Sequence, residues 1–218
     1  MSRTKARQLA AKFIQQNDPT GWFEELYSQA KGDSQEVPWA DLTVNPNLAQ
    51  WLDVNHIQGD DQTALVVGSG LGDDAEALSQ IGFEVTGFDI APSAIAWCQK
   101  RFPVSRVKYV VADALKFEKS WENKFDFILE AYTLQSVPDY IRHQIMKNMT
   151  KYLRPLGTLL VICRGREITE EVNDLPYPLT TEELTLFEEL GLKNITFEDY
   201  IDKKNSPVRR FRIQYTKY

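Results

Sequence analysis

The sequence of 218 residues lacks several features that would assign it to a class at once. No apolar run approaches the roughly 20 residues that span a bilayer, and the first residues do not form the apolar core of a secretion signal. Internal repeats and low-complexity segments are also absent. These absences predict a cytoplasmic protein with no membrane partner, and the length allows one domain, with or without an N-terminal extension.

Cysteine and histidine are scarce. The two cysteines, Cys98 and Cys163, lie in the apolar patterns of a predicted helix and a predicted strand, so we expect buried free thiols and no disulfide framework. The two histidines, His56 and His143, are expected to be surface or packing residues, and no metal site is predicted. Acidic residues outnumber basic ones by 31 to 25, and the net charge of -6 argues against a broad nucleic-acid-binding face.

The feature around which the rest is organised is a glycine-rich turn at residues 68–72. It follows an apolar strand, 64–67, and precedes a predicted helix, 73–80. Its three glycines let the chain turn tightly and let a ligand approach the backbone N–H groups of a helix start. Alone the turn is a weak signal, because any strand-to-helix turn can carry glycines.

Two further predicted strands end in acidic residues. The strand 84–89 ends at Asp89, about 20 residues after the turn, where a doubly wound sheet places a carboxylate against ribose hydroxyls. The strand 107–113 ends at Asp113. Because parallel strands bring their carboxyl ends to one edge of a sheet, the turn and both acids predict an adenosine-binding site.

The same turn distinguishes between adenosine cofactors. In a G-x-G-x-x-G dinucleotide fingerprint the pyrophosphate sits at the helix start. Here the third glycine comes one residue early, and Asp73 and Asp74 occupy the helix start. Two carboxylates repel a pyrophosphate and suit a cation such as the sulfonium of S-adenosylmethionine, unless they merely cap the helix. The turn therefore favours S-adenosylmethionine over NAD.

The rest of the chain alternates strands with helices and then ends in a hairpin. The further predicted strands are 125–131, 158–163, 195–201 and 208–215, and the further predicted helices are 93–102, 138–153 and 181–190. Pro155-Leu156-Gly157 is expected to stop the second of these helices, and residues 202–206 to form the hairpin loop. We predict an α/β fold: a Rossmann-like, doubly wound, mostly parallel seven-stranded sheet with a C-terminal antiparallel hairpin.

Three stretches resemble the first three motifs of class I S-adenosylmethionine-dependent methyltransferases, in order and at family spacing. They are residues 66–72, 87–95 and 111–114, and the resemblance extends over roughly residues 60 to 165. It departs from the family in the first strand, where Leu65 or Val66 replaces the usual acid. The resemblance implies a methyltransferase domain at 59–218 after an N-terminal segment at 1–58.

The N-terminal segment concentrates aromatic residues in what reads as irregular structure. Trp22, Tyr27 and Pro38-Trp39, followed by a predicted helix at 47–54, resemble the N-terminal region of thiopurine and of thiol or halide methyltransferases, with longer spacing here. Two interpretations stay open. The aromatic residues either pack onto the domain, or form a lid that attracts the sulfonium and excludes water.

The predictions assign residues to both ligands. The predicted cofactor-binding residues are Trp22, Trp39, Gly68, Ser69, Gly70, Asp74, Asp89, Ile90, Asp113, Ala114 and Glu130. The acceptor-side candidates, just beyond the fourth and fifth strands, are Tyr132, Gln135 and Arg164. Arg164 and its neighbour Arg166 either bind an anionic acceptor or neutralise Glu167 and Glu170. No catalytic residue is assigned.

The predicted activity is methyl transfer to a small molecule by in-line displacement at the sulfonium methyl. Without a histidine base in the site, a thiol, thiopurine or halide acceptor is favoured. The Asn/Asp-Pro-Pro-Tyr element of nucleic-acid amino methyltransferases is replaced by residues 130–133, so no nucleic-acid partner is expected. An NAD-type Rossmann oxidoreductase and a non-catalytic S-adenosylmethionine-binding protein remain as alternatives, and the pattern assigns no oligomeric state.

Overall fold

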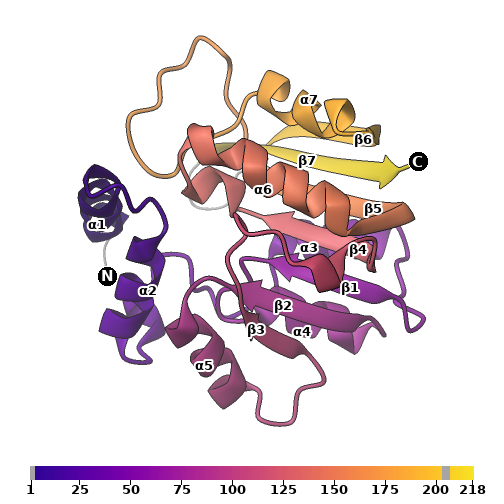
Figure 1. Cartoon of the computed structure of the whole chain (residues 1–218), viewed down its shortest axis with the longest axis horizontal. Helices are drawn as coiled ribbons and strands as arrows, with labels where there is room; N and C mark the ends of the chain where they lie inside the picture. The colour runs from indigo at the N-terminus through magenta and orange to yellow at the C-terminus, as the bar shows by residue number, and fades with distance from the viewer. Residues whose placement is uncertain (1–2, 203–206) are drawn as a thin grey trace. The chain divides into compact units, whose positions relative to one another are not determined.

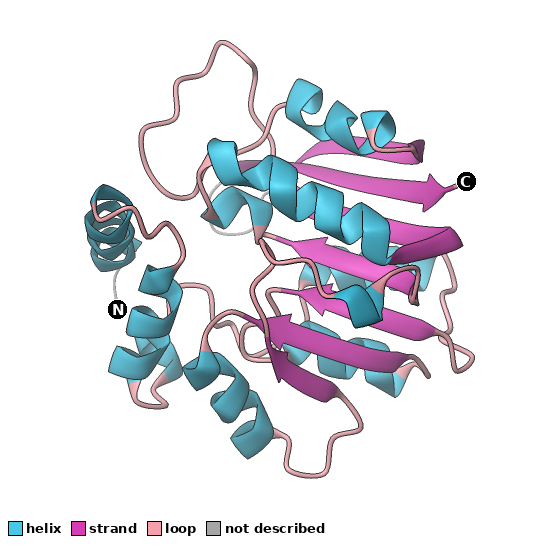
Figure 2. Ribbon diagram, viewed as in Figure 1, coloured by secondary structure: helices cyan, strands magenta, loops and turns pink. Residues whose placement is uncertain are grey.

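The seven strands of the computed structural model, which describes residues 3–202 and 207–218, form one mixed sheet. They are β1 (Thr63–Val67), β2 (Glu84–Asp89), β3 (Lys108–Val111), β4 (Phe125–Ala131), β5 (Leu153–Arg164), β6 (Leu192–Asp202) and β7 (Val208–Lys217). They hydrogen-bond in the order β3-β2-β1-β4-β5-β7-β6. β7 runs antiparallel to both β5 and β6, whereas the described pairs β2–β3, β1–β4 and β4–β5 are parallel. The predicted fold class is therefore confirmed (Figure 2).

Three helices precede the first strand, and four fall between strands as the alternating pattern predicted. They are α1 (Arg3–Gln15), α2 (Gly21–Ala30), α3 (Pro46–Val54), α4 (Asp73–Gln80), α5 (Pro92–Arg101), α6 (Asp139–Tyr152) and α7 (Thr181–Glu189), with 3₁₀ turns η1 (Ser34–Glu36), η2 (Lys119–Trp121) and η3 (Leu134–Ser136). Within the described ranges, no helix has both the length and the apolar character needed to cross a membrane. Residues 203–206 of the predicted hairpin loop lie outside the described residues.

The chain forms two compact units. The first comprises Met1–Asp61 and Gly68–Asp113, and the second comprises Gln62–Val67 and Ala114–Tyr218. The glycine turn and the end of β2 thus belong to the first unit, and the ends of β4 and β5 to the second. The predicted boundary between an N-terminal segment at 1–58 and a domain at 59–218 stays a prediction.

In the first unit, α4 and α5 pack on β2, and α2 packs on both α1 and α5 (Figure 1). The irregular structure expected around Trp22 is wrong, because these residues form the helix α2. The Asp18 carboxylate accepts a 2.8 Å hydrogen bond from the N–H of Gly21 and so satisfies one free donor of the helix start. Trp22, Leu26 and Ala30 recur at helical spacing and are buried, which gives α2 its apolar face.

In the second unit, α6 and α7 lie side by side on one face of the sheet (Figure 1). The Tyr215 hydroxyl of β7 donates to the Leu184 carbonyl of α7 at 3.1 Å. Because side chains alternate along a strand, Phe211 and Ile213 share that covered face and are buried. Arg210 and the even-numbered residues of β7 lie on the opposite face.

The helix ends before Pro155-Leu156-Gly157 as expected, but the following strand begins earlier than the predicted residue 158. α6 ends at Tyr152, and β5 begins at Leu153 and runs through these three residues. Its pairing with β4 shifts register there, from Phe125↔Leu153 to Phe127↔Thr158. Leu156, with φ of 64°, belongs to a bulge at the start of the strand, and bulges accommodate proline in a sheet.

Candidate functional site

The turn before α4 is built from glycines for two reasons. Gly70 and Gly72 have φ of 53° and 90°, in the left-handed region that favours glycine. A Cβ atom at Gly70 would lie 3.2 Å from the Tyr27 hydroxyl oxygen, and one at Gly72 would lie 2.5 Å from the Tyr109 hydroxyl oxygen. The turn therefore exposes its backbone without side chains at these two positions, and the Tyr27 hydroxyl packs against Gly70.

Asp89, at the end of β2, is bound to this turn. One carboxylate oxygen accepts a hydrogen bond from the N–H of Gly70 at 2.9 Å, and the other accepts from the N–H of Ala91 at 3.0 Å. Burial raises the pKa of Asp89 to about 6, while the backbone N–H groups of Ala91, Gly70 and Ile90 act in the opposite direction. A carboxylate has about four acceptor positions, so these backbone donors leave it able to accept a hydroxyl donor from a ligand.

The two acids at the start of α4 have separate roles. Asp73 forms a pair of hydrogen bonds with the Arg101 guanidinium, at 2.8 and 2.9 Å. Asp74 accepts a 2.7 Å hydrogen bond from the N–H of Asn45, and burial raises its pKa to about 6. The charge of Asp73 is thus balanced by Arg101, a partner that the sequence did not indicate. Asp74 has no hydrogen bond to a guanidinium among the described residues.

Three aromatic side chains of the N-terminal segment form a cluster beside Gly70. The Trp39 indole N–H donates to the Tyr27 hydroxyl at 2.9 Å, and the Trp39 ring stands edge-on to Trp22 at 5.9 Å. Trp22 is fully buried, whereas Trp39 is 41% exposed. Among the described residues, the indole N–H of Trp22 and the hydroxyl of Ser69 are buried without a hydrogen-bond partner. Trp39 is thus the member of the cluster that is most exposed to solvent.

The N-terminal segment is attached to the first unit by a specific contact. The Glu24 carboxylate of α2 accepts hydrogen bonds from the N–H and the hydroxyl of Ser93, at 2.9 and 2.6 Å, at the start of α5. An acid at this position satisfies free N–H donors and opposes the positive end of the helix dipole. Together with the burial of Trp22, this contact supports the packing interpretation of the segment over a free lid.

Three further residues predicted to bind the cofactor, and expected to face its adenine, are Ile90, Asp113 and Ala114. Ile90 and Asp113 are half-buried and follow β2 and β3, whose ends are joined by a 3.0 Å hydrogen bond from the N–H of Ala112 to the Asp89 carbonyl. Ala114 belongs to the second unit, where its carbonyl accepts a 2.8 Å hydrogen bond from the Asn148 side chain. Their contacts with an adenine stay predictions.

Glu130, near the end of β4, is completely buried in the second unit. One oxygen accepts a 2.8 Å hydrogen bond from the N–H of Leu134 at the start of η3, and the other has no partner among the described residues. Burial raises the pKa of Glu130 to about 7, and the Leu134 N–H is the largest opposing influence. A carboxyl group in this position is half protonated near neutral pH. Its predicted role in cofactor binding stays a prediction.

The acceptor-side candidates meet around the ends of β4 and β5. The Gln135 side-chain oxygen accepts a 2.7 Å hydrogen bond from the N–H of Arg164. Tyr132 follows β4 with φ of 68°, a conformation that a bulky residue rarely adopts. The Arg210 guanidinium lies over its ring, 4.8 Å from the centroid. The structure therefore brings all three candidates together within the second unit and adds Arg210 to them.

A buried arginine that the sequence did not indicate supports this region. Arg142 of α6 donates to the carbonyls of Leu134 and Tyr177 at 2.9 and 2.8 Å and pairs with the Glu183 carboxylate. Arg166 donates to the carbonyls, not the carboxylates, of Glu167 and Glu170, and also to Pro178. Arg166 therefore does not neutralise Glu167 and Glu170 but holds the loop before α7, and its predicted binding of an anionic acceptor stays a prediction.

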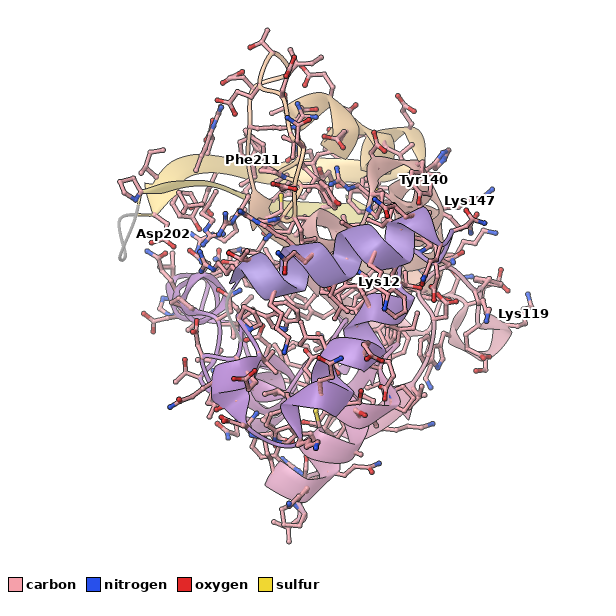
Figure 3. All side chains as sticks on the ribbon, turned by 90° about the vertical axis from the view of Figure 1, so that its left-hand side faces the viewer. Lys12, Lys119, Tyr140, Lys147, Asp202 and Phe211 are labelled. Atoms are coloured by element: carbon pink, nitrogen blue, oxygen red, sulfur yellow. The ribbon has the colours of Figure 1, made fainter. Side chains whose placement is uncertain are left out.

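Neither histidine lies among these residues. His56 is exposed after α3, and His143 is exposed on α6. Figure 3 labels Tyr140 and Lys147 of the same helix, and these exposed residues are three and four positions from His143. Within residues 3–202 and 207–218, no group of three His, Cys, Asp or Glu side chains is placed to hold a metal ion.

Residues 64–157, which include the glycine turn, Asp89 and Glu130, match the model of a family described as "Methyltransferase domain". The similarity to a methyltransferase domain thus extends over less than half of the chain and includes the glycine turn and the strands on either side of it. S-adenosylmethionine is the cofactor, as the glycine spacing predicted. The predicted resemblance to the class is confirmed, and the resemblance to one branch of it stays a prediction.

Relatives of known function share this domain. A demethylmenaquinone methyltransferase of Staphylococcus aureus (strain MRSA252) is 35% identical over 104 residues, which make up 46% of this chain and 41% of that enzyme. The chain thus spans less than half the length of the curated relatives it matches. In a solved structure, 1,6-didemethyltoxoflavin-N1-methyltransferase of Burkholderia thailandensis has a TM-score of 0.70 at 17% identity, with 89% of this chain and 87% of that chain covered. A TehB-like S-adenosylmethionine-dependent methyltransferase of Corynebacterium glutamicum has a TM-score of 0.64 at 20% identity, with 90% and 98% covered.

The residues of the first unit fit the cofactor. Gly70 presents bare backbone beside the Tyr27 hydroxyl, and the Asp89 carboxylate next to it is held by backbone donors. Buried donors without partners in the described chain, on Ser69 and Trp22, are available to the polar end of an amino acid. The sulfonium is a cation, and Trp39 presents an exposed ring of the kind that binds cations.

Proposed function

We propose that this protein transfers the methyl group of S-adenosylmethionine to a small-molecule acceptor. The observation that carries the proposal is the hydrogen bond from the Gly70 N–H to the Asp89 carboxylate, which fixes an acid beside a glycine turn in a methyltransferase domain. An acid fixed in this way is ready to accept the ribose hydroxyls without being reoriented on binding.

The chain's part in the reaction is binding and alignment. S-adenosylmethionine supplies an activated methyl group on a good leaving group, so the protein chiefly has to orient the acceptor and exclude water. In the first unit, Asp89 holds the ribose and Ser69 the amino-acid end of the cofactor. The aromatic cluster around Trp39 limits the access of water. In the second unit, Tyr132, Gln135 and Arg164 line the acceptor side.

We further propose a soft acceptor, namely a thiol, a thiopurine or a halide. Both histidines are exposed and lie outside the site residues, and a soft nucleophile reacts without a strong base. The match of Trp22, Tyr27 and Pro38-Trp39 to the N-terminal region of enzymes with such acceptors supports this choice. The printed names of relatives refer to a quinone precursor and to a toxoflavin precursor, so the fold itself is compatible with several acceptors.

The proposal is tested by incubating the full chain with S-adenosylmethionine labelled in its methyl group and a panel of thiols, thiopurines, halides, phenols and amines. We expect labelled product from at least one soft acceptor, and a rate that falls at least about tenfold for Asp89→Asn, the scale of hydrogen bonds to a charged group. Product from phenols or amines alone would overturn the soft-acceptor proposal. Cofactor binding without product from any acceptor would favour a non-catalytic S-adenosylmethionine-binding protein.

A further inference from the structure

The terminal hairpin places an arginine opposite Arg164. Arg210 of β7 pairs in register with Arg164 of β5 on one side and with Tyr200 of β6 on the other. Residues directly opposite each other in an antiparallel pair point to the same face of the sheet, with Cβ atoms about 5 Å apart. Two guanidinium groups therefore start from neighbouring positions on one face, at the end of β5.

Two like charges in such positions are unfavourable unless something negative joins them. The other arginines of this edge have carboxylate partners: Arg212 pairs with Glu198 at 2.7 Å, and Arg209 with Asp199 at 2.6 Å. Arg210 has a more distant carboxylate partner, because the Asp202 oxygen lies 3.6 Å from its Nε, beyond a normal hydrogen bond. That Nε is buried without a hydrogen-bond partner among the described residues.

The aromatic ring of Tyr132 holds Arg210 in this place. Its guanidinium lies 4.8 Å from the centroid of the Tyr132 ring, and stacking of this kind fixes the plane of an arginine. Tyr132 itself follows the end of β4 in a left-handed conformation, with φ of 68°. Unusual backbone conformations persist where the surrounding structure requires them, and they cluster at ligand sites. The side chain of Arg210 is only 13% exposed, so its position is well determined by packing.

We infer that Arg210 and Arg164 form an oxyanion site, and that the methyl acceptor carries a carboxylate or phosphate group that binds there. The inference rests on the proposed function, because it concerns the acceptor of the same reaction. Ligands of doubly wound folds bind at the carboxyl ends of the parallel strands, which is where β4 and β5 deliver Tyr132 and Arg164. A planar guanidinium donates two parallel hydrogen bonds to such a group.

Binding of simple anions tests the site without requiring turnover. Benzoate, phenyl phosphate and the neutral benzamide are titrated into the full chain at low ionic strength, with binding followed by ligand-observed nuclear magnetic resonance. We expect benzoate or phenyl phosphate to bind at least about tenfold more tightly than benzamide, the scale of one hydrogen bond to a charged group. Preference for benzoate identifies a carboxylate acceptor, and preference for phenyl phosphate identifies a phosphate acceptor.

Variants assign the binding to Arg210. Arg210→Gln should lose the preference for the anion, Arg210→Lys should keep part of it, and Asp202→Asn should strengthen it by removing a competing negative charge. Arg209→Gln is the matched control, because Arg209 is on the other face of β7 and pairs with Asp199. Thermal unfolding and S-adenosylhomocysteine binding of each variant show whether it is folded.

Equal binding of benzoate, phenyl phosphate and benzamide would overturn the inference, as would an anion preference that Arg210→Gln leaves unchanged in a folded protein. These results leave the proposed function intact if S-adenosylhomocysteine still binds. Conversely, loss of the proposed function would appear as a wild-type chain that does not bind S-adenosylhomocysteine, whatever the anions do.

Discussion

Asp74 and Asp89 of the first unit and two buried arginines of the second hold their charges in opposite ways. In the first unit, the carboxylates of Asp74 and Asp89 accept hydrogen bonds from backbone N–H groups. In the second unit, the buried guanidinium of Arg142 pairs with Glu183, and that of Arg212 with Glu198. A backbone N–H group orients a carboxylate but does not neutralise its negative charge. A carboxylate paired with an arginine does neutralise the positive charge of the guanidinium.

This difference separates binding groups from supporting groups. Asp89 keeps a negative charge that suits a cofactor carrying hydroxyl donors and a sulfonium. Arg142 and Arg212 are neutralised and support the fold, whereas the buried Nε of Arg210 has no hydrogen-bond partner among the described residues and its ion pair with Asp202 is longer, at 3.6 Å. The predictions below test whether the two kinds of group respond differently to substitution.

The largest effect is expected for Arg142→Gln. This change removes a buried guanidinium that bonds to two carbonyls and to Glu183, so partners are left unsatisfied in the interior. We expect the free energy of unfolding to fall by about 3–5 kcal/mol, measured by denaturant titration. Arg209→Gln, which breaks a more exposed pair, should cost about 1 kcal/mol or less. Equal losses for both variants would contradict a supporting role for Arg142.

Glu130→Gln tests the unsatisfied carboxyl of the second unit through its pH dependence. The folded pKa of Glu130 is about 7 against an ordinary 4.5, so the wild type binds a proton on folding. Its free energy of unfolding therefore falls, through this group, as the pH rises from about 4.5 to about 7. The Glu130→Gln variant has no such group to titrate, so its stability does not fall with pH for this reason. We expect the stability difference to move in favour of the variant by as much as about 3 kcal/mol over that range, and a constant difference would contradict the raised pKa.

A smaller effect is expected on cofactor affinity. Asp89 has a pKa of about 6 in the free protein, and its ionised form is the better acceptor for ribose hydroxyls. Affinity for S-adenosylmethionine should therefore fall as the pH drops below about 6, approaching tenfold per pH unit. Calorimetry between about pH 5 and about pH 7 measures this slope, and Asp89→Asn should flatten it. A slope that persists in this variant would assign the titration to another group, such as Asp74.

The smallest effect is expected for Trp39→Phe, which removes the hydrogen bond to the Tyr27 hydroxyl but keeps an aromatic ring. Thermal unfolding should show a loss of about 1 kcal/mol. If α2 is fixed by Glu24 and Trp22, limited proteolysis should find the N-terminal segment resistant without cofactor, in this variant and in the wild type. Protection from the protease that arises only when S-adenosylmethionine is added would support the lid interpretation instead.

The first unit was the more predictable of the two, for a physical reason. Gly70 and Asp89 are joined by one turn, the helix α4 and the strand β2, so their spacing in the sequence nearly determines their contact. The pairing of Asp73 with Arg101 was missed, because it depends on how α5 lies beside the turn. The helix α2 was missed because its aromatic residues were read as a loop, although Trp22, Leu26 and Ala30 carry a helical period.

The second unit was predictable in its strands but not in its site. Apolar runs located β4 and β5, and proline at position 155 was misread because the bulge that accepts it has no signature. Arg210 meets Arg164 only through the register of β5 with β7, which no local pattern encodes. Alternating arginines at 210 and 212 marked one face of a strand, but not what lies opposite.

The central claim is that Asp89 holds the cofactor, and one measurement tests it most directly. S-adenosylmethionine is titrated calorimetrically into the wild-type chain, Asp89→Asn and Asp73→Asn at about pH 7.5, above the pKa of Asp89. We predict that Asp89→Asn weakens binding by about ten- to a hundredfold, the scale of hydrogen bonds to a charged acceptor. Asp73→Asn should leave the affinity within about twofold, because Arg101 already binds that carboxylate. Unchanged affinity for a folded Asp89→Asn variant would contradict the account.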